Sequence, residues 1–459
     1  MPPARPNLLF VFGDQWRYNA VGYAGNDEVH TPHLDALRAE SIDLALAVSG
    51  CPVCTPARAS LLTGVRPLRH GLFLNDAPLN PDLPSIGKTL SEAGYATGWI
   101  GKWHVNAGGR HSYIPPERRH GFQHFQALEC THDYNQSRYF EGDDPTPRQW
   151  DGYDAIAQTS AAVNFMQAQA DRDDPFALFL SWGPPHSPYE TAPEAYRALY
   201  DPNSITLPPN VPEYPEYRAK VAEDLAGYYA HCTALDDCIA RLVESLRQSG
   251  QLENTWLVFT SAHGDLIGAH GLYDKQGPWE ESLRVPCLVR VPDAPENLRG
   301  ATSNLLHDFV DWFPTLCGWL GLEPPPDLQG RDHGALLLNE TLPEPNDALY
   351  ACYHAFGNWV HQSRGKPAWV KAREARGVRT ERFTYVEDHD GPWLLYDNEA
   401  DPYQLRNRVN DAELAEVQRN LAARLRELLA ENGDEFRPGM DYVRQWGYAV
   451  DASGTIPFK

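Results

Sequence analysis

Polar and ionisable residues follow each of four short apolar runs in this sequence. The runs are typical of buried strands and span Asn7–Phe12, Ala96–Ile100, Phe176–Ser181 and Thr255–Thr260. The residues that follow them are Asp14 and Gln15, Lys102 and His104, His186, and His263 and Asp265. Each one alone is most simply a loop residue with satisfied polar groups. In open α/β sheets, however, ligands bind beside the carboxyl ends of the strands, so we expect these residues to meet in one crevice.

A second concentration of reactive residues lies in Gly50–Gly64, with the sequence GCPVCTPARASLLTG. Thr55 suits an N-cap and Pro56 suits the first helical position, so a helix is predicted over Ala57–Thr63. Cys54 would then lie immediately before a helix N-terminus. Free N–H groups and the helix dipole favour an anion there and lower the pKa of a thiol.

Cys51 and Cys54 also form a C-x-x-C pair, which could be a redox pair or half of a zinc site. Neither is favoured, because no second C-x-x-C exists and Pro52 lies inside the pair. The eight cysteines are scattered through a chain without an export signal at its start. This distribution favours reduced thiols in a cytoplasmic protein.

The composition excludes several classes of partner. The chain has 459 residues and a formal net charge of −23, and such an acidic surface repels nucleic acid and anionic membranes. No apolar stretch reaches about 18 residues, so no transmembrane helix is predicted. An anion site in this chain would need concentrated local positive charge.

The order of predicted strands and helices along the chain indicates an α/β fold. Helical patterns lie between the strands at His33–Glu40, Leu83–Ala93 and Ala222–Gln248. Alternating strands and helices indicate a large, mostly parallel mixed sheet that is flanked by helices on both faces. The segment 105–150 lacks clear periodicity and is expected to be a long irregular excursion, which in a compact domain is often functional.

The pattern in the last quarter of the chain indicates a separate, smaller subdomain. Residues 322–348 are rich in Pro, Asp and Glu and read as a linker. Arg379–Glu387 and Pro392–Tyr396 then read as antiparallel strands, and Ala412–Asn432 as an amphipathic helix. We therefore expect a catalytic domain over residues 1–345 and a small C-terminal α+β subdomain over residues 346–459.

The C-x-P-x-R run Cys54–Arg58, followed by ASLLTG over residues 59–64, resembles the signature of the type I sulfatases, in the alkaline-phosphatase superfamily. The resemblance continues through Asn7–Gln15, Thr31–Leu37, Gly94–His104, Pro184–Pro188, Phe259–Pro286 and Leu395–Asp401. It implies an alkaline-phosphatase-like fold and hydrolysis of a sulfate ester. In that family a separate formylglycine-generating enzyme oxidises the core Cys to Cα-formylglycine, so that enzyme is the implied maturation partner of Cys54.

The resemblance also implies a role for each matched position. The metal ligands would be Asp14, Gln15, the residue made from Cys54, and His263. Arg58 would hold the formylglycine, Lys102 and His104 would contact the nucleophile and the sulfate, and His186 and Lys275 would contact the leaving group and the sulfate. The aldehyde hydrate has two hydroxyls: one attacks sulfur with the help of the metal, and the sulfate leaves when the other loses its proton. His104 is the expected base, and His186 or Lys275 the expected acid.

One position departs from the family pattern. The usual S-D-H-G-D run is Ser261–Asp265 here, with Ala262 in place of a metal-binding Asp. Hard divalent cations need several oxygen ligands and negative charge, so the loss should weaken metal binding severely. Asp265 is a carboxylate close by that could replace it. Ala262 is either an engineered change that silences the enzyme or a feature of a natural pseudoenzyme that binds sulfated ligands. The other catalytic positions, which are all retained, favour the first.

Metal and substrate remain open at this stage. Ca²⁺ is the default ion, while Gln15 and His263 make Mn²⁺ more plausible, and Mg²⁺ is a further alternative. A sulfated carbohydrate is the favoured substrate, and a phosphonate monoester or phosphodiester hydrolase of the same superfamily is the competing enzyme. A homo-oligomer is possible. Candidate substrate contacts, drawn from position alone, are Asn75, Trp103, His132, Asp133, Asn135, Trp279 and Glu280.

Overall fold

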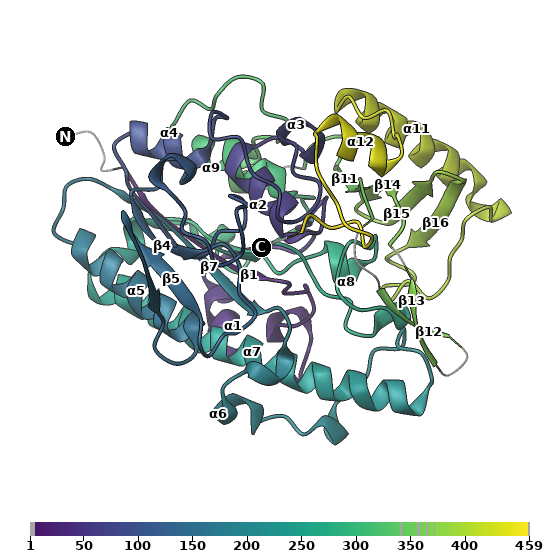
Figure 1. The fold of residues 1–459 in the computed structure, drawn as a ribbon, viewed down its shortest axis with the longest axis horizontal. Helices are drawn as coiled ribbons and strands as arrows, with labels where there is room; N and C mark the ends of the chain where they lie inside the picture. Colours follow the sequence, from purple (N-terminus) through teal and green to yellow (C-terminus); the bar gives the residue numbers. More distant parts are fainter. Residues whose placement is uncertain (1–4, 340–341, 356–358, 364–365, 371, 458–459) are drawn as a thin grey trace.

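A ten-stranded mixed sheet forms the centre of the protein in the computed structural model, which describes residues 5–339, 342–355, 359–363, 366–370 and 372–457. The sheet order is β10-β2-β9-β8-β1-β7-β3-β4-β5-β6 (Figure 1). Strands β8, β1, β7, β3 and β4 run parallel to one another, while β9, β5 and β6 pair antiparallel with their neighbours. The predicted α/β class with a mostly parallel sheet is confirmed. The strands span Asn7–Asp14 (β1), Ile42–Leu44 (β2), Ala96–Lys102 (β3), His124–Leu128 (β4), Arg138–Glu141 (β5), Asp144–Gln149 (β6), Phe176–Pro185 (β7), Thr255–Ser261 (β8), Leu288–Arg290 (β9) and Thr302–Ser303 (β10).

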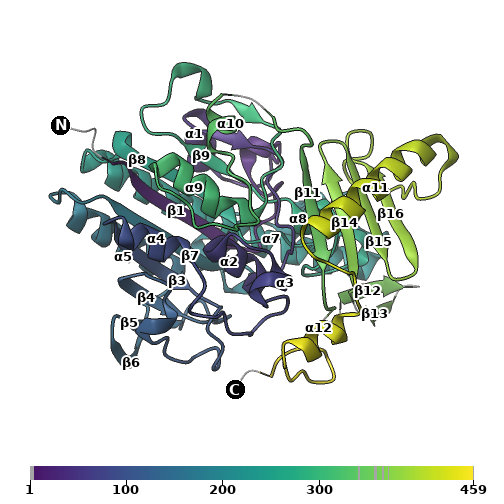
Figure 2. The same cartoon turned by 90° about the horizontal axis from the view of Figure 1, so that it is seen from above.

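Helices cover both faces of this sheet, and β1 shows why. Its residues Leu8, Phe10 and Phe12 belong to one buried cluster and Leu9 and Val11 to another, because successive side chains of a strand point to opposite faces. The first cluster includes side chains of α2, α4 and α9, and the second includes those of α1, α5 and α7 (Figures 1 and 2). The helices span Pro32–Ala39 (α1), Cys54–Thr63 (α2), Pro67–His70 (α3), Ile86–Glu92 (α4), Asp154–Gln169 (α5), Glu194–Arg197 (α6), Pro215–Gln248 (α7), Glu280–Leu283 (α8), Trp312–Leu320 (α9) and Gly334–Leu338 (α10).

Two expectations about irregular segments were wrong. Segment 105–150 contains β4, β5 and β6, which extend the central sheet. Strand β6 is largely exposed and carries two prolines, so it has no alternation of apolar and polar residues to reveal it. The expected linker 322–348 contains α10 and the first residues of β11, and His333 and Leu337 in it are buried.

A separate four-stranded antiparallel sheet follows, in the order β11-β14-β15-β16. Helix α11 lies across it and buries Leu421, Leu425 and Leu428 against Leu349 and Tyr385 (Figure 2). The domain boundary at 345/346 stays a prediction. The remaining elements span Asp347–Cys352 (β11), Trp359–Ser363 (β12), Lys366–Val370 (β13), Ala375–Thr380 (β14), Phe383–Asp388 (β15), Gly391–Asp397 (β16), Ala415–Glu431 (α11) and Gly439–Gln445 (α12).

Strand β11 approaches the reactive-cysteine segment closely. The Ala351 backbone N–H donates to Gly50 O at 2.8 Å. A Cβ atom on Gly50 would lie 2.4 Å from Leu349 O, which explains the glycine at this position. The second sheet therefore abuts the loop that leads into α2.

All eight cysteines are free and buried. Among the described residues, no helix combines the length and apolar character that crossing a bilayer requires.

Candidate active site

The ends of four adjacent parallel strands bring the candidate residues together. Asp14 ends β1 and Lys102 ends β3, while His186 directly follows β7 and His263 lies two residues beyond β8. Strands β8, β1, β7 and β3 are neighbours in that order, so these four side chains meet at one edge of the sheet.

Gln15 and His104, which follow β1 and β3, have left-handed backbone conformations, with φ of 71° and 60°. Such angles are uncommon outside glycine and collect at functional sites.

Cys54 lies at the centre of the group. It is the first residue of α2, with Val53 as the flanking residue, so the expected start of the helix was off by a few residues. Thr55 does not cap the helix; its hydroxyl donates to the His104 carbonyl at 2.8 Å. The Cys54 Sγ atom lies 3.4 Å from Asp14 Oδ1 and 3.3 Å from His263 Nε2. The helix N-terminus and the strand ends therefore converge on this side chain.

Asp14 carries the negative charge of the site and is held by two cations. Its Oδ2 atom lies 2.7 Å from Lys102 Nζ and 2.9 Å from Arg58 Nη2. Burial opposes ionisation, but Lys102, His263 and Arg58 hold the pKa of Asp14 well below its usual value. Arg58 also donates to Lys102 O at 2.7 Å and to Ser181 Oγ at 2.6 Å, which fixes its guanidinium between β3 and β7.

Positive charge outweighs negative charge around residue 54. Burial and Asp14 oppose a thiolate there, yet Lys102, Lys275 and His263 together hold the pKa of Cys54 well below its usual value. The site therefore favours an anion, and it has the concentrated positive charge that an anion site in so acidic a chain needs.

Lys275 and His186 form a second pair beside Cys54. Lys275 Nζ lies 2.7 Å from His186 Nε2 and also donates to Gln15 Oε1. His186 Nδ1 donates to Ser187 O at 2.8 Å, so its Nε2 accepts from the lysine. Burial and the Lys275 charge lower the pKa of His186 accordingly. In this pair the imidazole is neutral and the ammonium holds the proton.

His104 differs from His186 because the partner of its Nε2 atom is a carboxylate and not a lysine. Its Nε2 atom lies 3.2 Å from Asp76 Oδ1, and Asp76 also accepts from Arg110 Nη2 at 3.0 Å. Asp76 accepts a hydrogen bond from Nε2–H, so in the neutral imidazole the lone pair lies on Nδ1, which is buried without a hydrogen-bond partner. An imidazole with a free lone pair, oriented by a carboxylate, is a suitable general base.

Comparisons with known proteins agree with the chemistry that this site suggests. The Sulfatase family profile matches residues 6–322, and the profile "N-sulphoglucosamine sulphohydrolase, C-terminal" matches residues 268–431. The chain belongs to the sulfatase family. It is 39% identical over 459 residues to an ulvan-active sulfatase of Formosa agariphila, with 99% of this chain and 87% of that protein covered.

Two further comparisons extend the similarity of this sulfatase-family chain. An endo-4-O-sulfatase of Bacteroides thetaiotaomicron is 29% identical, with 94% of this chain and 92% of that protein covered. A solved structure in complex with its substrate D-glucosamine-2-N,6-O-disulfate has a TM-score of 0.82 at 25% identity and covers 95% of this chain and 99% of that chain.

The sulfatase family uses a metal ion and a formylglycine, and the residues here fit a single cation. His263 Nδ1 donates to Gly264 O at 2.9 Å, and its Nε2 faces Asp14 Oδ1 at 3.2 Å. A proton on Nε2 bridges these two atoms when His263 is charged, and a metal ion could take the place of that proton. Asp14, His263, Gln15 and residue 54 would hold such an ion.

Ala262 adds no ligand to the predicted metal site. It is completely buried and offers no donor atom. Asp265 makes other contacts: its Oδ2 accepts from Gln15 Nε2 at 2.6 Å and from the Tyr189 hydroxyl at 2.5 Å, and its Oδ1 accepts from Ile267 N. Asp265 therefore orients Gln15, and Asp14 is the one carboxylate among the predicted ligands.

Several candidate substrate contacts already have partners within the fold. Trp103 is completely buried between Trp99 and Phe125, and Trp279 packs on His270. Glu280 is buried in an ion pair whose Oε1 lies 2.7 Å from Arg379 Nε. Asn135 donates to Thr191 O, and Asn75 accepts the Thr55 N–H at 3.0 Å, where it supports the start of α2. Satisfied partners in the fold explain these five positions.

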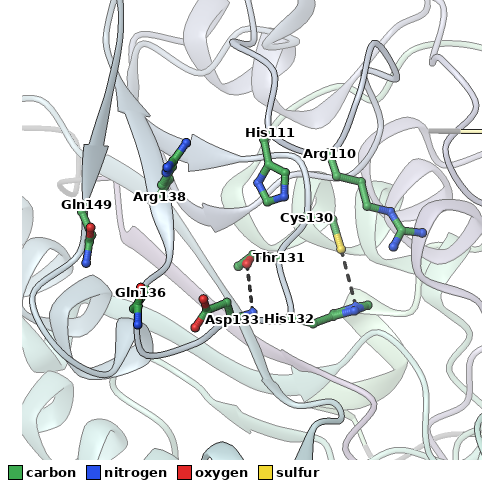
Figure 3. Close-up of a pocket in the computed structure, with 9 residues that line it drawn as sticks. All are labelled: Arg110, His111, Cys130, Thr131, His132, Asp133, Gln136, Arg138 and Gln149. Atoms are coloured by element: carbon green, nitrogen blue, oxygen red, sulfur yellow. Dashed lines mark hydrogen bonds between the residues drawn. The ribbon is translucent and has the colours of Figure 1, made fainter. Parts of the chain in front are cut away.

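His132 and Asp133 do line a cavity of about 780 Å³ next to the site (Figure 3). Four residues of the site or its cavity were not predicted from the sequence: Asp76, Ser181, Arg110 and Arg138. None belongs to a motif, and only long-range packing brings them to the site or its cavity. The cavity is lined by Arg110, His111, Cys130, Thr131, His132, Asp133, Gln136, Arg138 and Gln149.

Proposed function

We propose that this chain hydrolyses a sulfate ester of a carbohydrate, with the residue made from Cys54 as nucleophile. The observation that carries the proposal is the position of Cys54 at the N-terminus of α2, within 3.4 Å of Asp14 Oδ1 and 3.3 Å of His263 Nε2. Saccharide chemistry is supported by the ulvan-active and endo-4-O-sulfatase relatives and by the glucosamine disulfate complex.

The residues divide the work of such a reaction among them. A formylglycine hydrate at position 54 would supply a nucleophilic hydroxyl, and a divalent cation held by Asp14, Gln15 and His263 would supply the charge that makes it acidic. Lys102 and Lys275 place ammonium groups around the sulfate, where they offset charge on its oxygens. Lys275 holds the proton that the leaving alcohol needs, and His186 orients it. His104 Nδ1 accepts the proton whose removal releases the sulfate.

Ala262 supports a second candidate function, which is binding of sulfated ligands with little or no turnover. The cationic groups that hold a sulfate are all retained, whereas a metal-binding carboxylate is missing. We propose that the chain as it stands binds its ion weakly, that Ca²⁺ suffers most because it needs six to eight oxygen ligands, and that Mn²⁺ tolerates the His263 nitrogen better than Ca²⁺ or Mg²⁺ does.

The test compares the chain with its Ala262→Asp variant, each produced together with a formylglycine-generating enzyme. The mass of the peptide that contains Cys54 verifies the aldehyde. Rates are measured side by side on sulfated monosaccharides, an aryl sulfate, an aryl phosphate diester and an aryl phosphonate. We expect sulfate release to dominate and to be faster in Ala262→Asp. Preference for the phosphonate would overturn the proposal, and sulfate-ester binding without turnover in both proteins would establish the second candidate.

A further inference from the structure

The cavity in Figure 3 adjoins the catalytic residues through two separate contacts. The His132 ring, on its wall, stacks on His186 with ring centroids 4.6 Å apart and planes at 16°. Arg110, on another wall, donates to Asp76, which in turn holds His104. A ligand with its sulfate at Cys54 would therefore extend into this cavity.

The lining has the chemistry of an anion site. Among the nine described residues that line the cavity there is no Phe, Trp or Tyr to stack on a sugar face, and Asp133 is the one carboxylate. Desolvation of the ring and the nearby Lys102 and Lys275 charges lower the pKa of His132 to about 2, so its ring is neutral. Positive charge in the cavity therefore comes from Arg110 and Arg138.

Arg138 differs from Arg110 in having its charge available. Arg110 is committed to Asp76 through two nitrogens, at 3.2 and 3.0 Å. Arg138, on β5, is exposed and makes no side-chain hydrogen bond or ion pair within the described part of the chain. Its neighbour Arg148 on β6 is instead paired with Glu141 and Asp144. A free guanidinium in a cavity is unusual in a chain with a net charge of −23.

We infer that this cavity is a subsite for a second anionic group of the substrate, a carboxylate or a second sulfate ester, which Arg138 binds. The inference rests on the proposed function, because the first sulfate must sit at residue 54. A planar guanidinium binds either oxyanion through two parallel hydrogen bonds, and Gln136 and Gln149 add neutral donors beside it.

Calorimetric binding to the chain with Ala262 tests the subsite without relying on turnover. The ligands are glucosamine 6-sulfate, glucosamine 2-N,6-O-disulfate, and a 6-sulfated disaccharide with an adjacent uronic acid. The variants are Arg138→Gln and, as the matched control on the next strand, Arg148→Gln. Arg138→Gln should weaken binding of a doubly anionic ligand by about 10- to 100-fold and leave the singly sulfated ligand unchanged. Arg148→Gln should change neither.

The pattern of losses separates the possible outcomes. Loss on the disulfate alone identifies a sulfate subsite, and loss on the uronic acid ligand alone identifies a carboxylate subsite. If the singly sulfated sugar binds and the second anion adds nothing, or if Arg138→Gln weakens all ligands equally, the subsite is refuted while the proposed function stands. If no sulfated ligand and no inorganic sulfate binds, both are refuted. Arg138 is exposed, so the melting temperature of its variant should match that of the parent.

Discussion

Replacing Ala262 by Asp restores the carboxylate that the sulfatase pattern places next to His263. The Ala262 backbone N–H donates to Gly13 O at 3.0 Å, so the position is anchored between β8 and β1. The side chain is completely buried. A new carboxylate there lies beside the Asp14 group, and without a cation it would be a second buried negative charge.

The expected size of the effect follows from that burial. Leaving a buried charge without its partner costs roughly 3–5 kcal/mol, and about 1.4 kcal/mol corresponds to a tenfold change in affinity. The metal ion should therefore bind about 100- to 4000-fold more tightly to Ala262→Asp than to the parent chain. The same reasoning predicts that the metal-free variant unfolds at a lower temperature than the parent and regains stability when metal is added.

Calorimetric titration with Ca²⁺ and Mn²⁺, metal content after dialysis, and melting curves with and without metal measure these effects. Ala262→Asn is the matched control, since it has a similar size and no charge; it should gain far less metal affinity. Sulfate release by the formylglycine-bearing protein gives the functional readout. If Ala262→Asp takes up no more metal than Ala262→Asn and gains no activity, position 262 is not part of the metal site and the reasoning fails.

Three further predictions concern residues outside the metal site. Burial raises the pKa of Glu129 to about 8, so the folded state loses stability as the pH rises from about 4.5 to about 8. The Glu129→Gln variant should therefore be more stable than the parent at pH 9, by up to about 5 kcal/mol, and about equally stable at pH 4. Urea titrations at the two pH values measure this difference. Asp76→Ala should lower kcat about 100-fold with little change in KM in active protein, because His104 loses its orienting partner; an unchanged kcat would show that His104 is not the base. Gly50→Ala should lower the free energy of unfolding by roughly 1–3 kcal/mol, because its Cβ would press on Leu349 O, and an unchanged urea midpoint would contradict that close contact.

Much of the frame could be predicted because it depends on local pattern. The four apolar runs are buried strands of the central sheet, and each is followed by residues that meet at Cys54. Parallel neighbours in a sheet end at the same edge, so the strand assignment alone was enough to bring Asp14, Lys102, His186 and His263 together. Strands β5 and β6 were not predicted, because they lie at the outer edge of the sheet, where exposed side chains and prolines replace the alternating pattern.

The reactive centre could be located from the sequence, because the C-x-P-x-R run, the helix behind Cys54 and the missing carboxylate at Ala262 are all local features. The surroundings of that centre depend on the three-dimensional fold. It placed Trp103 in the core and Arg138 in the cavity, and it paired Asp76 with His104. The physical reason is that these roles depend on contacts between segments far apart in the chain, and neither residue type nor spacing specifies which partner a side chain will meet.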